Sequence, residues 1–248
     1  MEENNEWYNK WFNSPYYHLL YHNRDQQEAK DFINNLVSAL QIEEGKKILD
    51  LACGKGRYSI YLSEMGFDVT GVDLSQKNIT LAKKHEHDGL QFFVEDMRNS
   101  IKENYFDYIF NMFTSFGYFE SEAENRQVIE SVAKSLVPGG KFILDFLNPY
   151  RVIHNLIPFE KITINGVSFS LNRRYDDEKK TIIKTIDIND DGKEFCFHEK
   201  VRAIRRVEFM DYFERAGLKL LDTFGDYDLG KYIPEKSERM IFLVEKPK

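Results

Sequence analysis

The sequence has 248 residues, of which 42% are apolar, and its 34 basic and 41 acidic residues give a formal net charge of −7. Such a chain can bury a sizeable core, and its acidic balance argues against nucleic acid, which attracts proteins through phosphate charge. Two cysteines cannot form a disulfide framework, and no apolar run approaches the ~18 residues of a membrane span. The first ten residues lack the basic and apolar regions of a signal peptide. We therefore expect a cytoplasmic globular protein with no membrane and no nucleic-acid partner.

The first 150 residues alternate between helix and strand patterns. Apolar residues at three- and four-residue spacing predict helices over 26–40, about 55–65, 76 to about 85, and around 128–136. Runs rich in β-branched and aromatic residues predict strands at KKILDLA, FDVTGVD, LQFFVED, YFDYIFNMF and KFILDFL, and VPGG is expected to form a turn before the last of these. Strands that alternate with helices pair in parallel through right-handed crossovers. The sequence therefore predicts an α/β fold with a doubly wound, mostly parallel sheet.

The pattern changes after Pro149. From about Lys161 to Arg206 the apolar residues recur at every second position, and turn residues such as Asn165-Gly166 separate the runs. This predicts an inserted antiparallel β meander, after which VEFMDYFERAGLKLLDTFGDYD and RMIFLVEK return to helix and strand. We expect three parts: an N-terminal helical cap with the ligand-binding α/β core over 1–150, the insertion over 151–206, and a C-terminal part over 207–248 that completes the core sheet.

The stretch DLACGKG joins the first predicted strand to the following helix. Gly54 and Gly56 would let the backbone approach a ligand closely and leave amide donors at the start of the helix. In a dinucleotide fingerprint such a loop holds a pyrophosphate, but here Ser59 takes the place of the third glycine and Asp50 lies four residues before Gly54. A carboxylate so near the loop suits a ligand that carries an ammonium group.

This acid followed by GxG resembles the first motif of the class I S-adenosylmethionine (SAM) dependent methyltransferases, which have a Rossmann-like sheet. The resemblance covers residues 30–150 well and 206–248 in outline. It implies SAM as cofactor and S-adenosylhomocysteine as product, with Asp73 accepting hydrogen bonds from both ribose hydroxyls and Asp96-Met97 at the adenine edge. The full set of cofactor-binding residues that we expect is Asp50, Ala52, Cys53, Gly54, Gly56, Asp73, Leu74, Asp96, Met97, Phe113, Tyr17, Tyr21 and Arg24; no metal site is expected.

Several of these residues also have purely structural interpretations. Asp50 could cap its own loop, Asp73 could cap the next helix in place of Ser75, and Asp96 could be a surface acid. Cys53 is interpreted as a small loop residue rather than a nucleophile, because no histidine is locally paired with it. The aromatic N-terminal segment with Tyr17 and Tyr21 either packs on the core or covers the cofactor.

The acceptor is expected to be a small molecule with an N, O or C nucleophile. Transfer from a sulfonium mainly needs alignment, so no general base is obligatory. The fourth strand leads into Asn111-Met112-Phe113-Thr114 rather than the Asn/Asp-Pro-Pro-aromatic motif of amino-methylating DNA enzymes, and there is no Pro-Cys pair for cytosine C5 chemistry. The resemblance places Phe113, Ser115, Phe116 and Tyr118 near the methyl group. No catalytic residue stands out, and the candidates are Tyr118, Asn148 and His198, with Arg173 and Tyr232 behind them.

Alternatives remain for the function and for the insertion. The chain could be a non-catalytic SAM-binding module, or an NAD-dependent oxidoreductase, although the latter would need a glycine at Ser59 and a catalytic Tyr/Lys or His set. The insertion has an apolar face that must be buried, formed by Ile162, Ile164, Val167, Phe169 and Leu171. We expect it to be a lid over the strand ends or a dimer element, in a protein that is a monomer or homodimer.

Overall fold

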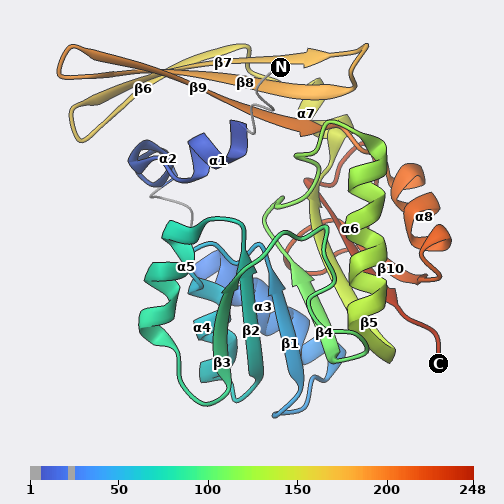
Figure 1. Ribbon diagram of the computed structural model, residues 1–248. Coiled ribbons are helices and arrows are strands. Elements are labelled where there is room, and N and C mark those ends of the chain that lie inside the picture. Colours follow the sequence, from blue (N-terminus) through green and yellow to red (C-terminus); the bar gives the residue numbers. More distant parts are fainter. Residues whose placement is uncertain (1–6, 22–25) are drawn as a thin grey trace.

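The computed structural model describes residues 7–21 and 26–248, so the expected site residue Arg24 lies outside the described residues. An α/β core forms the larger part of the molecule, and a second sheet lies above it (Figure 1). Two short N-terminal helices lie between the second sheet and the core (Figure 1). In the described ranges, no helix is long and apolar enough to cross a membrane.

Within the described residues, the core sheet has seven strands in the order β10-β11-β5-β4-β1-β2-β3. Strands β1 to β5 pair in parallel, whereas β11 is antiparallel to both β5 and β10. Their bounds are β1 (Lys47–Leu51), β2 (Asp68–Asp73), β3 (Leu90–Val94), β4 (Phe106–Asn111), β5 (Leu136–Leu147), β10 (Lys219–Phe224) and β11 (Arg239–Glu245). The predicted doubly wound, mostly parallel sheet is confirmed.

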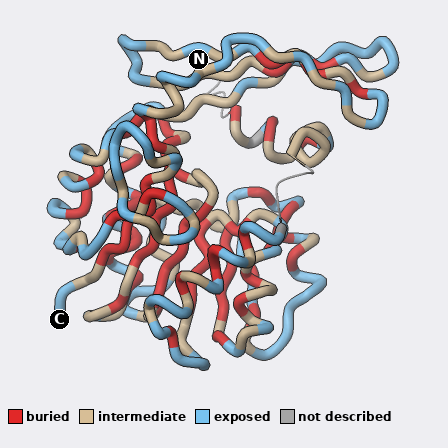
Figure 2. Tube along the Cα trace, turned by 180° about the vertical axis from the view of Figure 1, so that it is seen from behind, coloured by how far each residue is buried: buried red, intermediate tan, exposed pale blue. Residues whose placement is uncertain are grey.

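Helices cover both faces of the core sheet because each has one apolar stripe to bury. One face is covered by α3 (Gln26–Leu40), α4 (Arg57–Glu64) and α5 (Gln76–Ala82), which is followed by the short 3₁₀ helix η1 (Lys83–His85). The other face is covered by α6 (Glu122–Ser135) and α8 (Arg206–Arg215). Figure 2 shows buried residues along the strands and exposed residues on the outer sides of the helices.

The turn expected at VPGG is wrong, because these residues belong to β5. Gly139 has a φ of +83° and its N–H donates to the carbonyl of Lys246 at 2.7 Å, just beyond the end of β11. Hydrogen bonding to the segment just after β11 therefore prolongs β5 through residues that are locally typical of a turn. A second local feature was also missed: α7 (Pro149–His154) follows β5 directly, with proline at its start and Asn148 as its N-cap.

The predicted antiparallel insertion is confirmed. In the part of the chain that the structure describes it forms a four-stranded sheet, which we call the meander, in the order β6-β7-β8-β9. Its strands are β6 (Phe159–Ile164), β7 (Val167–Asp176), β8 (Thr181–Asp190) and β9 (Lys193–Arg202). The β6–β7 turn uses Asn165 and Gly166, both with positive φ, as two-residue hairpins require.

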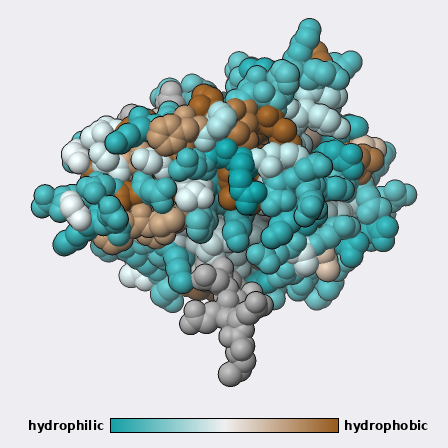
Figure 3. All heavy atoms as spheres, turned by 90° about the horizontal axis from the view of Figure 1, so that it is seen from above, coloured by the Kyte–Doolittle hydropathy of each residue, from teal (hydrophilic) through white to brown (hydrophobic). Residues whose placement is uncertain are grey.

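The apolar face of the meander is buried by the N-terminal helices α1 (Trp7–Phe12) and α2 (Pro15–Leu20). Val167, Phe169 and Leu171 are buried there, in one cluster with Trp7 and Trp11. The opposite face is polar, with exposed residues such as Asn172, Asp187 and His198. Figure 3 shows accordingly that the upper side of the molecule is mostly hydrophilic, with a smaller group of apolar side chains.

Candidate functional site

The glycine loop lies between the end of β1 and the start of α4, at the carboxyl ends of the parallel strands. It is held in an unusual shape, because Ala52, Gly54 and Gly56 all have positive φ. A Cβ added at Gly54 would meet no atom within 4 Å, so this glycine faces open space. A Cβ at Gly56 would lie 2.5 Å from the ring of Phe92. Packing against Phe92 is thus a second reason for glycine at position 56, whereas the open space at Gly54 is compatible with the expected ligand.

Asp50 is a buried carboxylate behind this loop, and only 3% of it is exposed. The hydroxyl of Ser59 donates to its Oδ2 at 2.5 Å. Burial raises the pKa of Asp50 to about 6; the Ser59 hydrogen bond opposes this shift and the nearby charge of Asp73 adds to it. The backbone N–H of Ser59 donates to Asp50 as well. A buried acid with no adjacent cation among its described partners would be stabilised by a positively charged ligand group.

Asp73 ends β2 and points back at the glycine loop. Its Oδ2 accepts from the N–H of Gly54 at 2.9 Å, and its Oδ1 accepts from the N–H of Ser75 at 2.8 Å. Ser75 itself caps α5 by accepting from Asn78 N at 3.1 Å, so Asp73 is not the cap. Burial raises the pKa of Asp73, although these backbone hydrogen bonds oppose the shift. The side chain of Asn78 also donates to this carboxylate. Since each carboxylate oxygen has two acceptor sites, Asp73 keeps some capacity to accept from a ligand hydroxyl.

Cys53 and Leu74 flank these acids. The thiol of Cys53 is buried, and burial, followed by the charges of Asp50 and Asp73, raises its pKa. A raised pKa disfavours the thiolate, which agrees with the interpretation of Cys53 as a small loop residue. Leu74 is 38% exposed beside Asp73, which leaves an apolar side chain at the surface of the site.

Asp96 follows β3 and is held by Arg98, a residue that the sequence did not single out. The Nε of Arg98 lies 3.0 Å from both carboxylate oxygens, and a further guanidinium nitrogen donates to Glu124 at 2.7 Å. Burial would raise the pKa of Asp96, but the hydrogen bonds and charge of Arg98 lower it overall. Met97 packs against the core beneath this loop.

The segment after β4 also lies at the strand ends. Phe113 and Thr114 have φ values of +59° and +58°, and the ring of Phe113 stacks on Tyr58 of α4 at 4.7 Å between centroids. Asn111 is fully buried and donates from its Nδ2 to the carbonyl of Leu51 at 2.9 Å. Its Oδ1 has no partner among the described residues, so a polar atom that a ligand could satisfy lies between β1 and β4.

Tyr17 and Tyr21 lie on and just after α2, beneath the meander. The hydroxyl of Tyr21 donates to Glu199 of β9 at 2.6 Å, and Glu199 also accepts from Trp11 Nε1 and Lys184 Nζ, each at 2.7 Å. The ring of Tyr17 packs on that of Tyr21, with centroids 5.1 Å apart. Both tyrosines are therefore placed against the meander.

The N-terminal helices reach the core at the turn between α1 and α2. Asn13 contacts the start of α5 there: it accepts from the hydroxyl of Ser75, and its carbonyl lies 3.2 Å from Lys77 Nζ. His18 of α2 lies near Lys55 of the glycine loop, and burial together with the charges of Lys55 and Lys77 lowers the pKa of His18 to about 4. The N-terminal helices are thus joined to the start of α5 through Asn13, and they place His18 near the glycine loop.

The catalytic candidates are not brought together. The ring of Tyr118 packs on Trp7 at 5.4 Å between centroids, while Asn148 is buried as the cap of α7 and donates to two carbonyls, Pro234 and Ser237. His198 lies on the outer, exposed face of the meander, 3.3 Å from the hydroxyl of Thr185. The other candidates have structural partners. The hydroxyl of Ser115 donates to the carbonyl of Met112, and Arg173 pairs with Glu160. Phe116 is buried in the core, and Tyr232 packs against it.

The arrangement combines three features that fit one kind of ligand. Gly54 faces open space, Asp50 is a buried acid that a cation would stabilise, and Asp73 can accept from a ligand hydroxyl. These suit a nucleoside that carries an ammonium group, which is the description of SAM. No group of three or more His, Cys, Asp or Glu side chains that could hold a metal is found within the described ranges.

Comparison with known proteins gives the same result. Residues 48–140 match the family model described as a methyltransferase domain. The chain is 32% identical to "Putative methyltransferase YqeM" of Bacillus subtilis over 114 residues, which are 45% of this chain and 46% of that protein, so the match spans about half of that relative. It is 25% identical to "Putative methyltransferase GWCH70_2453" of Geobacillus sp. over 97% of both chains.

Solved structures share the whole fold. A SAM-dependent methyltransferase from Clostridium acetobutylicum superimposes with a TM-score of 0.79 at 22% identity, covering 94% of this chain and 96% of that one. SAM-bound CalS10, an amino pentose methyltransferase from Micromonospora echinaspora, gives a TM-score of 0.68 at 20% identity over 94% and 97%. The chain thus contains a methyltransferase domain over residues 48–140, and it shares the fold of solved SAM-dependent methyltransferases.

Proposed function

We propose that the protein is an enzyme that transfers the methyl group of SAM to an N, O or C nucleophile of a small-molecule acceptor. The observation that carries this proposal is the open space at Gly54 beside the carboxylates of Asp50 and Asp73, at the carboxyl ends of β1 and β2. A separate pocket of about 520 Å³ beside α7 and the meander is the place that we propose for the acceptor. Its volume suits a small molecule. SAM, when bound, supplies an electrophilic methyl group on a sulfonium.

The chain's own residues would hold the cofactor at the glycine loop. Asp50 would face the ammonium group, Asp73 would accept from the ribose hydroxyls, and Gly54 leaves the room that the ligand needs. Asp96 and Met97 would border the base, and Phe113 would border the reacting end. The assignment of each residue rests on the resemblance together with the burial and hydrogen bonding of these groups.

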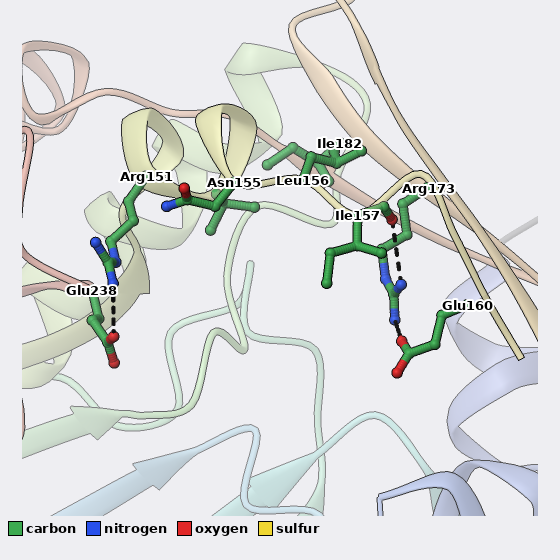
Figure 4. Close-up of a pocket in the computed structure, with 9 residues that line it drawn as sticks. Arg151, Asn155, Leu156, Ile157, Glu160, Arg173, Ile182 and Glu238 are labelled. Carbon is green, nitrogen blue, oxygen red and sulfur yellow. Dashed lines mark hydrogen bonds and ion pairs between the residues drawn. The ribbon is translucent and has the colours of Figure 1, made fainter. Parts of the chain in front are cut away.

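The pocket is made by α7, the start of β11 and the inner face of the meander. Arg151 of α7 pairs with Glu238 at 3.2 Å, and Arg173 of β7 pairs with Glu160 of β6 at 2.6 Å (Figure 4). Leu156, Ile157 and Ile182 add apolar surface. Because its charges are already paired, this pocket fits an acceptor with both polar and apolar parts and no large net charge.

The meander is proposed to be a lid rather than a dimer element. Side chains alternate between the faces of a strand, so Arg173, which lines the pocket, lies on the same face of β7 as the buried Phe169 and Leu171. The inner face of the meander therefore packs on the N-terminal helices and also lines the pocket. This face is then not available for contact with a second subunit. A monomer needs no further burial, while pairing through an edge strand would allow a homodimer.

The relatives support a small acceptor. CalS10 is described as an amino pentose methyltransferase and another solved structure, KedS8, as a sugar N-methyltransferase. Together with the net charge of −7, which disfavours nucleic acid, this favours a small polar acceptor such as an amino sugar.

The test has two parts. Calorimetric titration with SAM, S-adenosylhomocysteine and NAD should show binding of the first two and none of NAD. Formation of S-adenosylhomocysteine should then depend on an added acceptor from a panel of amino sugars, phenols and free amino acids. Tight SAM binding without turnover on any acceptor class would favour a non-catalytic SAM-binding module, and NAD binding would contradict the proposal.

A further inference from the structure

Two consecutive residues after β4 adopt a backbone conformation that side chains disfavour. Phe113 and Thr114 have φ values of +59° and +58°, in the left-handed region. Such a φ is a genuine outlier for a β-branched residue such as threonine. It persists only where the surrounding structure enforces it, and outliers of this kind cluster at functional sites.

One residue of β5 enforces this conformation. The carboxylate Oδ2 of Asp145 accepts from the N–H of Phe113 at 2.7 Å, and the backbone carbonyl of Asp145 accepts from the N–H of Thr114 at 3.2 Å. Both amides of the strained pair thus end on the same residue. Because Asp145 is completely buried, water cannot take its place as the acceptor.

Arg239, the first residue of β11, completes the arrangement. Its Nε donates to Oδ1 of Asp145 at 2.8 Å, and another of its guanidinium nitrogens donates to the hydroxyl of Thr114 at 2.8 Å. The antiparallel pairing of β11 with β5 brings this cation to the carboxylate. A buried carboxylate without such a partner would be strongly unfavourable, so Asp145 and Arg239 act together.

The consequence is a fixed position for the ring of Phe113. It stacks on Tyr58 at 4.7 Å and meets the edge of Tyr227 at 5.8 Å between centroids. Tyr227 is itself anchored, because its hydroxyl donates to Asp145 at 3.2 Å. The carboxylate therefore holds both the backbone of Phe113 and one of the rings that contact it.

We infer that Asp145 and Arg239 are positioning residues for methyl transfer, which hold Phe113 and Thr114 in the conformation that borders the cofactor. The inference rests on the proposed function for the place of the cofactor. It also links two regions of the site, since Glu238, which lines the acceptor pocket, is the residue next to Arg239. Neither Asp145 nor Arg239 would touch the reacting atoms.

The test compares Asp145 of β5, which contacts the segment after the carboxyl end of β4, with Asp107 near the amino end of β4. Asp145→Asn keeps the size of the side chain but loses the charge, so it cannot satisfy Phe113 N–H and Arg239 equally well. It should weaken SAM binding, measured by calorimetry, by roughly tenfold, which is the size expected for losing one charge-assisted hydrogen bond. Asp107 accepts from the N–H of Lys47 at 2.9 Å and pairs with Lys46 at the far end of the strand. The matched Asp107→Asn variant should leave SAM affinity unchanged.

A rescue experiment distinguishes a positioning role of Asp145 from a role in overall stability alone. Glycine adopts a positive φ readily, so Thr114→Gly should lessen the effect of Asp145→Asn on SAM affinity, and the double variant should bind more tightly than the two single losses predict. If Asp145→Asn lowers only the melting temperature and leaves SAM affinity and the rate of turnover unchanged, the inference is overturned. The same holds if the two effects on affinity simply add.

A second variant guards against loss of folding. Arg239→Lys keeps the positive charge beside Asp145 but cannot reach both Asp145 and Thr114 with one planar group. It should fold and still weaken SAM binding several-fold, and unchanged affinity would contradict the inference. Wild-type protein that binds SAM but methylates no acceptor would count against the proposed function alone, because the comparison of affinities still stands.

Discussion

The hydroxyl of Ser59 lies 2.5 Å from Oδ2 of Asp50, and both residues are buried at the carboxyl end of β1. Ser59 stands where a dinucleotide-binding loop would have its third glycine. Ser59 therefore has a role of its own: its hydroxyl holds the carboxylate of Asp50, an acid that would be a poor neighbour for a pyrophosphate. The hydrogen bond also keeps the carboxylate partly stabilised when no cation is near.

Asp50 should make the unliganded protein less stable as the pH rises. Its pKa in the folded protein is about 6, above the ordinary value of 3.8, so its contribution to stability is present below 3.8 and lost as the pH rises through 6. Each pKa unit corresponds to about 1.4 kcal/mol. Asp50→Asn should therefore raise the free energy of unfolding at pH 8 by up to about 3 kcal/mol, measured by chemical denaturation, while weakening SAM binding. The partly exposed Asp211, which pairs with Arg215 on α8, gives the control variant Asp211→Asn. Equal unfolding curves for Asp50→Asn and wild type at pH 8 would contradict this expectation.

The two loop glycines should respond differently to alanine. Both have positive φ, which disfavours any Cβ by about 1–2 kcal/mol. At Gly56 the new Cβ would also overlap the ring of Phe92 at 2.5 Å, whereas at Gly54 it enters open space. Gly56→Ala should lower the melting temperature more, and Gly54→Ala should weaken SAM binding more. The reverse order in calorimetry and thermal unfolding would show that the ligand does not lie at Gly54.

Much of this could be read from the sequence. The alternation of strand and helix patterns predicts the sheet, and the acid-glycine loop with Asp73 predicts which end of that sheet binds the ligand. Contacts between distant residues could not be predicted in this way. Asp145 and Arg239 are 94 positions apart, and only the register of β11 on β5 brings them together. In the sequence Ser59 only replaces the third glycine of a dinucleotide fingerprint, because a hydrogen bond to Asp50 leaves no local pattern.

The packing of the N-terminal segment is another contact between distant residues that the sequence could not predict. Its aromatic residues indicate packing, but the sequence does not say that the partner is the meander, more than 140 residues further along the chain. Likewise, Asn148 is a helix cap because Pro149 starts α7 directly after β5. That role follows from a local signal, and attention to proline at a helix start could have found it.

Glu199 should hold the N-terminal helices to the meander. It accepts from Trp11, Tyr21 and Lys184 in a partly buried position. Glu199→Gln removes the charge that these donors share, so α1 and α2 should open more often. Hydrogen exchange of residues 7–21 should become faster by several-fold, and SAM should dissociate faster. The exposed Glu194→Gln on the same strand is the matched control, and unchanged exchange in Glu199→Gln would argue against this role.

Filling the pocket should affect the acceptor and spare the cofactor. Ile182 lines the pocket on the inner face of β8, while its neighbour Ile183 points to the opposite face. Ile182→Trp should raise the KM for the acceptor about tenfold or abolish turnover, because a large side chain excludes the ligand from a small pocket. The affinity for SAM should stay within about twofold of wild type. Ile183→Trp should change neither quantity, and an equal effect of both variants would mean that the pocket is not the acceptor site.

The most direct measurement is a crystal structure of the protein with S-adenosylhomocysteine. The account predicts ligand density at the carboxyl ends of β1 and β2, with both ribose hydroxyls on the carboxylate of Asp73, the amino group on the side of Asp50 and the backbone of Gly54 against the ligand. It also predicts that the sulfur lies on the side of Phe113. Density that places the nucleoside away from Asp73, or in the pocket between α7 and the meander, would contradict the central claim.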